Sequence, residues 1–469
     1  MLKKIRIITA LLAFVIVLTD MPVIPGGYSL CESISEAQDP PRRRRRGRGR
    51  PTPPPAPEPE PEKKEVIPAD AEDEYLVIRG ATIHTVTGGT HRNGTLICKN
   101  GKIYQIVAGP VDGPEGAEIV DASGHHVYPG LVAFRSSGLV GSGEAEKSQD
   151  PFGLNTTMGL AAGITSTWNG SRVTKLVHGS LDDLTIRPKS FSSINYSYRN
   201  PRGRRELRKA MDRVQEHLRA LERHAEEKKE NPDAKAPDDK WIKGIFATVR
   251  SLLTGESQAL VRARSMAEIR EYSALARKYG FEIVFEGAEE GWIDPGVLSR
   301  TGASAVISPR ARVDANEDLN RESGSSIENA RMLHDAGVPL VIIPQSTGIA
   351  LWGLAGRDLS HLPLEAAFAV RGGLPEQVAI EAITIEPARL LGVADRVGSL
   401  EVGKDADFII TDGDLLSYMT LVRWAFVNGK IQYDKEEERI LDHIRPGGDL
   451  DAPPPDDHWP RRLGDPLEG

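Results

Sequence analysis

The sequence predicts an α/β fold in which a barrel of alternating strands and helices is joined to a small β-domain. Two observations predict the barrel: apolar runs of strand length recur between residues 131 and 344, and helical runs separate several of them. A third observation predicts the β-domain. Short alternating strands with turn signals fill residues 74–121, and the same pattern returns at 406–434.

The predicted barrel strands are mostly continuous apolar runs, as expected for parallel strands buried on both faces. They are LVAF (131–134), ITSTW (164–168), LTIR (184–187), ALVRAR (259–264), FEIVFE (281–286), SAVIS (304–308) and VPLVIIP (338–344). The predicted helices are 155–162, 201–229, 266–279, 294–301, 324–336, 363–371 and 375–384. Chemistry in such folds usually lies beyond the carboxyl ends of the strands. After the first strand those residues are Arg135, Ser136 and Ser137.

The β-domain carries three Asn-Gly pairs that favour hairpin turns, at Asn93-Gly94, Asn100-Gly101 and Asn428-Gly429. Its histidines are interpreted as strand residues rather than ligands. His84 and His91 belong to no spaced pair, and strand alternation points His125 and His126 to opposite faces.

The N-terminus has the pattern of a targeting segment. Basic residues precede a short apolar run, Ile7 to Leu18, which suits a signal-peptide core better than a membrane span. We therefore expect residues 1–30 to be a cleaved signal or a retained anchor. The protein would then be exported to a periplasm or cell surface, or anchored there.

Residues 31–73 and 437–469 are expected to be disordered. The first of these is an Arg/Pro/Glu-rich linker. Its basic run, Arg42 to Arg50, is either a solvated tether or a contact with an anionic membrane surface.

Composition limits the possible chemistry. The formal net charge of -8 gives no argument for nucleic-acid binding. There are two cysteines, Cys31 and Cys98, and Cys31 lies next to the leader. A disulfide framework and a zinc site built on thiolates are therefore not expected. The sequence does not define an oligomeric state.

Both ends of the folded region resemble a known family. EPARLLGVADRVGSLEVGKDADFIITDGD (386–414) resembles the C-terminal signature of the amidohydrolase superfamily, especially its imidazolonepropionase-like branch. Residues 81–132, which end in VYPGLV, are similar to the N-terminal part of that family, and GLAAGITST (159–167) resembles the segment leading to the second strand.

The resemblance covers about residues 75–435. It implies a (β/α)8 TIM-like barrel at 131–395 and a composite β-sandwich built from 74–130 and 396–436. It also implies hydrolysis of C–N bonds in cyclic amides or related substrates. In that chemistry, histidines and carboxylates hold divalent metal, which activates a water molecule.

This sequence departs from the family at the metal-binding positions. Where the family continues its first strand into a His-x-His pair, Arg135 and Ser137 stand here. The histidines expected on two middle strands align near Arg262 and Glu286, and the aspartate of a late strand aligns near Gln345 or Ser346.

Because a guanidinium cannot lose its charge, it would repel a dication. We therefore expect Arg135, Arg262 and Glu286 to form a compensated charge cluster, no resident cofactor, and a catalytically impaired protein. Its pocket would suit a small anionic ligand or be a relic.

Two other hypotheses remain at this point. The protein could be an active hydrolase with a changed or absent metal set. A zinc-type ion at His178, Asp182 and Asp183, or a nucleophile such as Ser136, Ser137 or a water held by Glu286, would serve it. Alternatively, it could be a structural member of a surface complex that is contacted through its Arg/Pro-rich leader.

Overall fold

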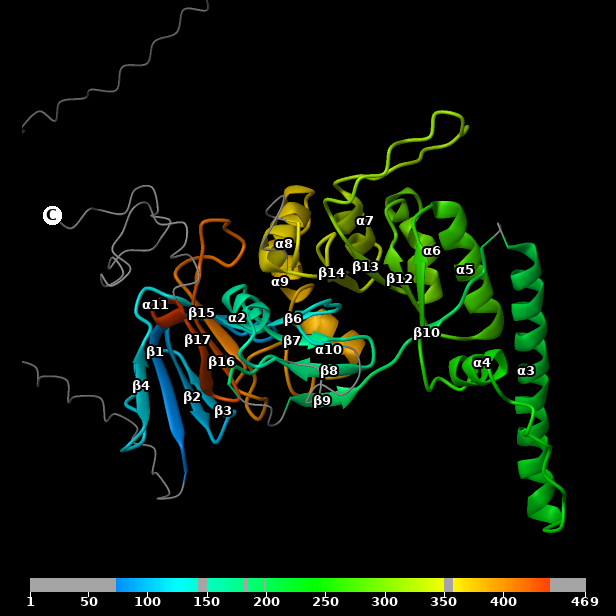
Figure 1. The fold of residues 1–469 in the computed structure, drawn as a ribbon, viewed down its shortest axis with the longest axis horizontal. Coiled ribbons are helices and arrows are strands. Elements are labelled where there is room, and N and C mark those ends of the chain that lie inside the picture. Colours follow the sequence, from blue (N-terminus) through cyan, green and yellow to red (C-terminus); the bar gives the residue numbers. More distant parts are fainter. Residues whose placement is uncertain (1–72, 142–149, 180–183, 198–199, 350–356, 439–469) are drawn as a thin grey trace, which may run out of the picture. The chain divides into compact units, whose positions relative to one another are not determined.

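The computed structural model describes residues 73–141, 150–179, 184–197, 200–349 and 357–438, whose strands form three sheets (Figure 1). The predicted leader, and nearly all of the predicted linker and tail, lie outside these residues. Within the described part of the chain, no helix is both long enough and apolar enough to cross a membrane.

The first sheet joins strands from both ends of the chain. Its order is β17-β16-β15-β5-β1-β2-β3, and β4 also pairs with β1. The strands are β1 (Tyr75–His84), β2 (Thr90–Lys99), β3 (Lys102–Val107), β4 (Glu118–Asp121), β5 (His126–Pro129), β15 (Phe408–Thr411), β16 (Val422–Val427) and β17 (Lys430–Asp434). The amide N of Ile103 in β3 donates to Lys404 O at 2.9 Å, so the sheet curls back toward the start of β15.

The second and third sheets supply the barrel strands. β10 (Ser192–Ser193), β11 (Ala259–Ala263), β12 (Ile283–Gly287), β13 (Ser304–Ile307) and β14 (Leu340–Ile342) are parallel and adjacent in that order. β6 (Leu131–Ala133) pairs in parallel with β7 (Ile164–Trp168). The α/β class with a parallel strand array is confirmed.

A short connection bridges the two groups of parallel strands. Val132 N in β6 donates to Ile383 O at 3.0 Å, and Ile342 N in β14 donates to Ala382 O at 2.9 Å. The segment at 382–383 therefore occupies a strand position between β14 and β6.

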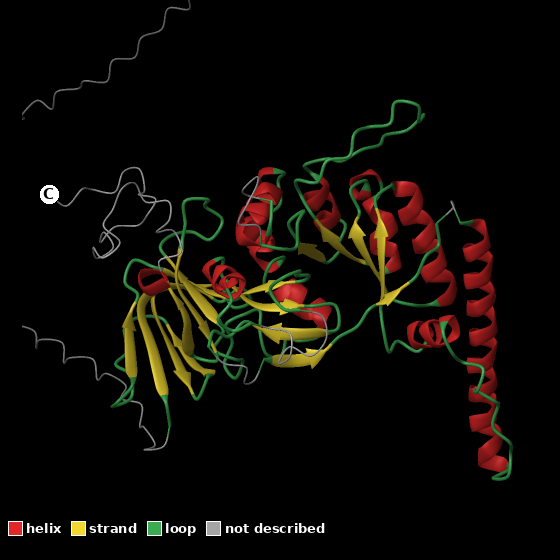
Figure 2. Ribbon diagram, in the orientation of Figure 1, coloured by secondary structure: helices red, strands yellow, loops and turns green. Residues whose placement is uncertain are grey.

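Helices accompany the parallel strands (Figure 2). They are α2 (Leu154–Ala161), α3 (Pro201–Glu230), α4 (Ile245–Leu253), α5 (Met266–Tyr279), α6 (Pro295–Thr301), α7 (Asn329–Asp335), α8 (Leu362–Arg371), α9 (Glu376–Glu381) and α10 (Ile385–Leu391), with α11 (Lys435–Glu438) after β17. Two 3-10 turns, η1 (Gly291–Ile293) and η2 (Leu359–His361), complete the set. Helix α5 matches its predicted bounds because a Ser265–Glu268 capping box begins it and Gly280, at φ 76°, ends it.

Alternating side chains divide the barrel core into two layers. Val132, Val284, Val306 and Val341 belong to one buried cluster, which also contains residues of α10 and Phe134 and Trp168. Their neighbours along the strands, such as Phe285, pack in a second cluster with the helices. Leu260 and Arg262 pair in register with Val284 and Glu286, so the mouth of the array lies at the Arg262–Glu286 level.

Two predicted elements require correction. LTIR forms a strand, β9 (Thr185–Pro188), but β9 pairs antiparallel with β8 (Arg172–Lys175), which itself pairs antiparallel with β7. β9 is only partly buried, so it lacks the two covered faces of a parallel barrel strand. The helix predicted at 324–336 is limited to α7.

One predicted hairpin turn is also wrong. Asn93-Gly94 lies inside β2, where Asn93 has a positive φ of 51° and the β1–β2 register shifts around Ala81. The pair therefore forms an irregularity in a continuous strand. Asn100-Gly101 and Asn428-Gly429 do form the β2–β3 and β16–β17 turns, with positive φ at both residues of each pair.

A buried ion-pair network links β8 to the segment before β15. The Lys175 side chain is 0% exposed, and its Nζ lies 2.8 Å from Asp405 and 2.9 Å from Asp407. Asn428 also accepts a hydrogen bond from Lys175. Lys102 and Arg396 bind the same Asp405 carboxylate, at 2.9 and 2.7 Å. Burial raises the pKa of Asp405, but Lys175 and the other cations outweigh it and hold this pKa at about 2.

Replacing Lys175 should be strongly destabilising. Lys175→Met leaves two buried carboxylates without their shared cation, which costs about 3–5 kcal/mol of unfolding free energy. Denaturant unfolding measures this loss. Lys240→Met, at an exposed position, is the control and should change stability by less than about 0.5 kcal/mol. Equal stability of the two variants would contradict the assigned role.

Two histidines that the sequence left unpaired meet between β1 and β5. His84 Nε2 lies 3.0 Å from His126 Nδ1, and the His84 ring stacks on Tyr128 at 4.2 Å between centroids. Burial, together with the charge of His126, lowers the pKa of His84 to about 4, although Asp414 opposes this shift. His125 instead faces Trp424, so the two neighbouring histidines do point to different surroundings as predicted.

The His84 pair predicts a loss of stability in mild acid. The unfolded chain protonates this imidazole below about pH 6.5, whereas the folded chain resists protonation until about pH 4. Stability should therefore fall as the pH drops through this window, by on the order of 2 kcal/mol after allowing for partial solvent exposure. His84→Asn should flatten this part of the curve of unfolding free energy against pH, whereas His91→Asn should not. Parallel curves for wild type and His84→Asn would reject the interpretation.

Candidate functional site at the barrel mouth

Arg135, which follows β6, and Glu286, which lies near the end of β12, form a bidentate ion pair. Arg135 Nη1 lies 3.1 Å from Glu286 Oε1, and Nη2 lies 3.0 Å from Oε2. The guanidinium also lies 5.9 Å from the centre of the Trp168 ring. The Arg135 side chain is 38% exposed and that of Glu286 is 17% exposed, so solvent reaches the arginine. This geometry matches the contact expected between these two residues.

Arg262 lies beside this pair but does not join it. It stands opposite Glu286 in the β11–β12 register, and its side chain is exposed. Among the described residues it forms no ion pair with Glu286. The expected cluster of three charges therefore consists of one ion pair and one neighbouring cation.

The residues that follow β14 form hydrogen bonds with the loops around the barrel mouth. Gln345 Nε2 donates to Arg310 O at 2.9 Å, and Ser346 N donates to Arg357 O at 2.9 Å. Ser137 N donates to Thr347 O at 2.6 Å, which brings the β6 and β14 loops together. Gln345 and Ser346 thus lie on the same side of the array as Ser137.

Other charges at these strand ends are already paired. Arg310, which follows β13, binds the fully buried carboxylate of Glu365 in α8 through its backbone N at 2.9 Å and its Nε at 2.6 Å. Arg264 binds Glu289 at 2.9 Å. Sequence reasoning missed Glu365, although one acid within the apolar helix LPLEAAFAV is a signal that a buried partner exists.

Ser136 is almost fully buried, at 8% exposure, and its Oγ has no hydrogen-bond partner among the described residues. Its backbone N donates to Trp168 O at 3.3 Å. No imidazole is described in contact with this hydroxyl, so the geometry supplies no base to activate it as a nucleophile.

The donor set at the mouth does not fit a divalent metal. Of the six substituted positions, Glu286 supplies the single carboxylate, and both of its oxygens already face a guanidinium. The other five positions are Arg135, Ser137, Arg262, Gln345 and Ser346. Throughout the described residues, no three His, Cys, Asp or Glu side chains gather in a way that could hold a metal ion. We therefore derive no metal-dependent step at this site.

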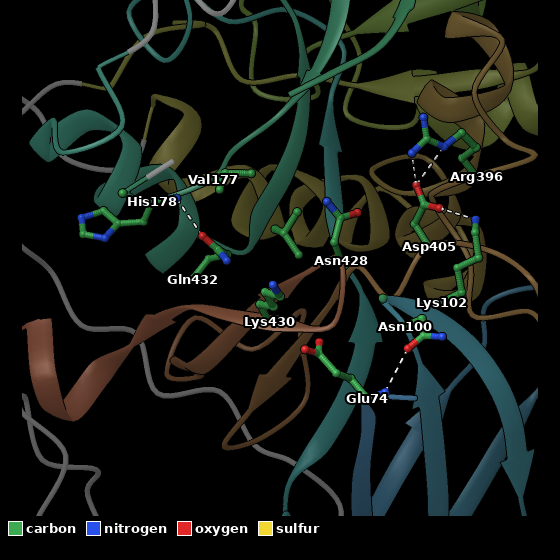
Figure 3. A pocket seen from close by; sticks show the side chains of 13 residues that line it. Glu74, Asn100, Lys102, Val177, His178, Arg396, Asp405, Asn428, Lys430 and Gln432 are labelled. Carbon is green, nitrogen blue, oxygen red and sulfur yellow. Dashed lines mark hydrogen bonds and ion pairs between the residues drawn. The ribbon is translucent and has the colours of Figure 1, made fainter. Parts of the chain in front are cut away.

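The alternative site at His178 lies elsewhere in the fold. Asp182 and Asp183 fall outside the described residues. His178 borders a cavity of about 670 Å³ beside β17, together with Lys102, Arg396 and Lys430 (Figure 3). Its backbone N donates to Gln432 at 2.8 Å, and its ring meets Phe152 edge-on. The structure thus places His178 at the composite sheet.

The architecture described above is that of an α/β barrel joined to a composite sheet. The family model "Amidohydrolase family" matches residues 291–447. The chain is 49% identical over 171 residues to the imidazolonepropionase of Syntrophobacter fumaroxidans, covering 32% of this chain and 38% of that protein. It is 24% identical over 291 residues to the amidohydrolase tasK of Hapsidospora irregularis, covering 60% of this chain and 27% of that protein.

The solved structures agree on the fold. An amidohydrolase from Thermotoga maritima superposes with a TM-score of 0.57 at 19% identity, covering 77% of this chain and 100% of that one. The chain is thus similar to the amidohydrolase family over residues 291–447 and to imidazolonepropionases over part of its length, and it shares the fold of the Thermotoga maritima protein. It spans less than two fifths of the length of the two curated relatives it matches here.

The Arg135–Glu286 contact should be measurable by a double-mutant cycle. Because the arginine is well exposed, we expect a coupling energy of about 1 kcal/mol between Arg135→Met and Glu286→Gln. Unfolding free energies of the two single variants and the double variant give this value. The same cycle with Arg262→Met in place of Arg135→Met should give a smaller coupling. A larger coupling for Arg262 would mean that Glu286 pairs with the other arginine.

Proposed function

We propose that the protein is a catalytically impaired member of the superfamily whose barrel mouth binds a small anionic ligand. The observation that carries this proposal is the Arg135–Glu286 ion pair. It fills the end of the first barrel strand with a permanent cation, at the position where the family resemblance expects metal-binding histidines.

The charge balance of the mouth supports an anion as the ligand. Glu286 compensates Arg135, and Arg264 and Arg310 have carboxylate partners of their own. Arg262 remains as an exposed cation beside Glu286. An exposed guanidinium next to a paired one presents planar N–H donors that match a carboxylate or phosphate.

The similarity to imidazolonepropionases favours the same ligand class. The name of that relative describes an enzyme acting on imidazolonepropionate, a small cyclic amide that carries a carboxylate. In this proposal, the chain keeps recognition of such an anion through Arg262 and lacks the metal that would activate water. The proposal includes a place of action at the cell surface or in the periplasm, where the leader would hold Arg42 to Arg50 near anionic lipid.

Measuring bound metal in the wild type and in a variant with the two histidines restored tests whether the barrel mouth lacks a catalytic metal. Full-length protein purified with zinc and manganese supplied should contain well under one equivalent of metal by mass spectrometry. Arg135→His combined with Ser137→His restores two imidazoles and should raise zinc retention several-fold. One equivalent of tightly held metal in the wild type, with turnover of imidazolonepropionate, would overturn the proposal. Loss of that metal in His178→Ala would locate it at the sheet pocket.

Anion binding tests the second half. Succinate should bind saturably to the wild type at constant ionic strength, and Arg262→Gln should weaken this binding about tenfold. Isothermal titration calorimetry gives the affinity and the number of sites. Lys240→Gln removes an exposed charge elsewhere and should leave both unchanged. Equal succinate binding by wild type and Arg262→Gln would refute a role for the barrel mouth in anion recognition.

A further inference from the structure

The cavity beside β17 has a cationic floor that belongs to the buried network. Asp405 is 4% exposed and accepts contacts from Lys102, Lys175 and Arg396. Figure 3 shows Lys102 and Arg396 on either side of this carboxylate. Arg396 uses Nε and Nη2 in that contact, at 2.9 and 2.7 Å, which leaves Nη1 uncommitted in the described structure. The Asp405 carboxylate is therefore buried, whereas the Lys102 and Arg396 side chains remain 57% and 38% exposed and can reach the cavity.

The cavity wall adds hydrogen-bond donors from Lys430, Gln432 and Asn428, all of which line the cavity. Lys430 and Gln432 both line the cavity, and the β16–β17 register shifts between Ile431 and Tyr433, at Gln432. Lys430 is exposed and has no ion-pair partner among the described residues. Gln432 Oε1 accepts from His178 N, and Asn428 Oδ1 accepts from Lys175. Because both amide oxygens are occupied, their NH2 groups are the available ends.

The charges of the cavity leave a positive surplus. Two carboxylates line the cavity, those of Asp405 and of Glu74 at the rim. Three cationic side chains line it, namely Lys102, Arg396 and Lys430, while Lys175 and Asp407 pair beneath them. A fixed cationic floor with convergent amide and ammonium donors is the chemistry that binds anionic oxygens.

We propose that this cavity is a second ligand site, which binds a small molecule through a phosphate or carboxylate group. Lys430 Nζ is the principal contact, and the amide groups of Asn428 and Gln432 donate to the same oxygens. Asp405 is a positioning residue, because its carboxylate holds the side chains of Arg396 and Lys102 in place. The site is built on the composite sheet, so it does not depend on the chemistry of the barrel mouth.

Titration with two anions tests the site and distinguishes the head groups. Inorganic phosphate and citrate are added separately to the full-length protein at constant ionic strength, and binding is followed by calorimetry and by the thermal unfolding midpoint. We expect saturable binding of at least one of them and a loss of affinity of about tenfold in Lys430→Gln. Saturating anion should also slow acetylation of Lys430, measured by peptide mass spectrometry.

Matched variants separate this site from the barrel mouth. Arg262→Gln should keep the Lys430-dependent binding, and Lys240→Gln should behave as wild type. Binding that survives in Lys430→Gln but is lost in Arg262→Gln would overturn this proposal and leave the barrel-mouth proposal standing. Absence of saturable binding, or equal acetylation of Lys430 with and without anion, would also overturn it.

Discussion

The buried Lys175 ammonium and its two aspartates are the constraint on which much of this structure depends. A buried charge is tolerated only when its partners are fixed. Here the charge is that of Lys175 in β8, and its partners are the two aspartates of the Gly-Lys-Asp-Ala-Asp segment before β15. Asp405 and Asp407 lie within the segment 386–414 that resembles the family signature, and in this structure they join two sheets through Lys175. The Lys175 interaction thereby fixes the frame against which both candidate sites are placed.

Much of the architecture could be predicted from the sequence, because it follows from local patterns. The capped helix α5 and the Asn-Gly turns at 100–101 and 428–429 have short-range causes. The β8–β9 hairpin could not be predicted in the same way. LTIR has strand character, but its pairing direction depends on which neighbour it meets, and periodicity does not contain that information.

The sites show the same division between local and distant causes. The resemblance placed Arg135 and Glu286 at two separate metal-ligand positions, and their ion pair joins residues 151 positions apart. Arg262 was expected in the same cluster, but register alone places it beside Glu286 without deciding its contact. The Glu365–Arg310 pair and the His84–His126 contact were not predicted, because each arises where separate elements pack together.

The composite sheet also constrains how the chain is made. Lys175 and Asp405 are 230 positions apart, and β5 pairs with β15, so the sheet cannot be completed until nearly the whole folded region is available. Until then, the open edges of β1 to β5 and the unpartnered Lys175 are exposed to other chains. Such long-range pairing is slow to form. A chain released from synthesis before β15 has emerged would therefore be a substrate for chaperones and proteases rather than a partly working protein.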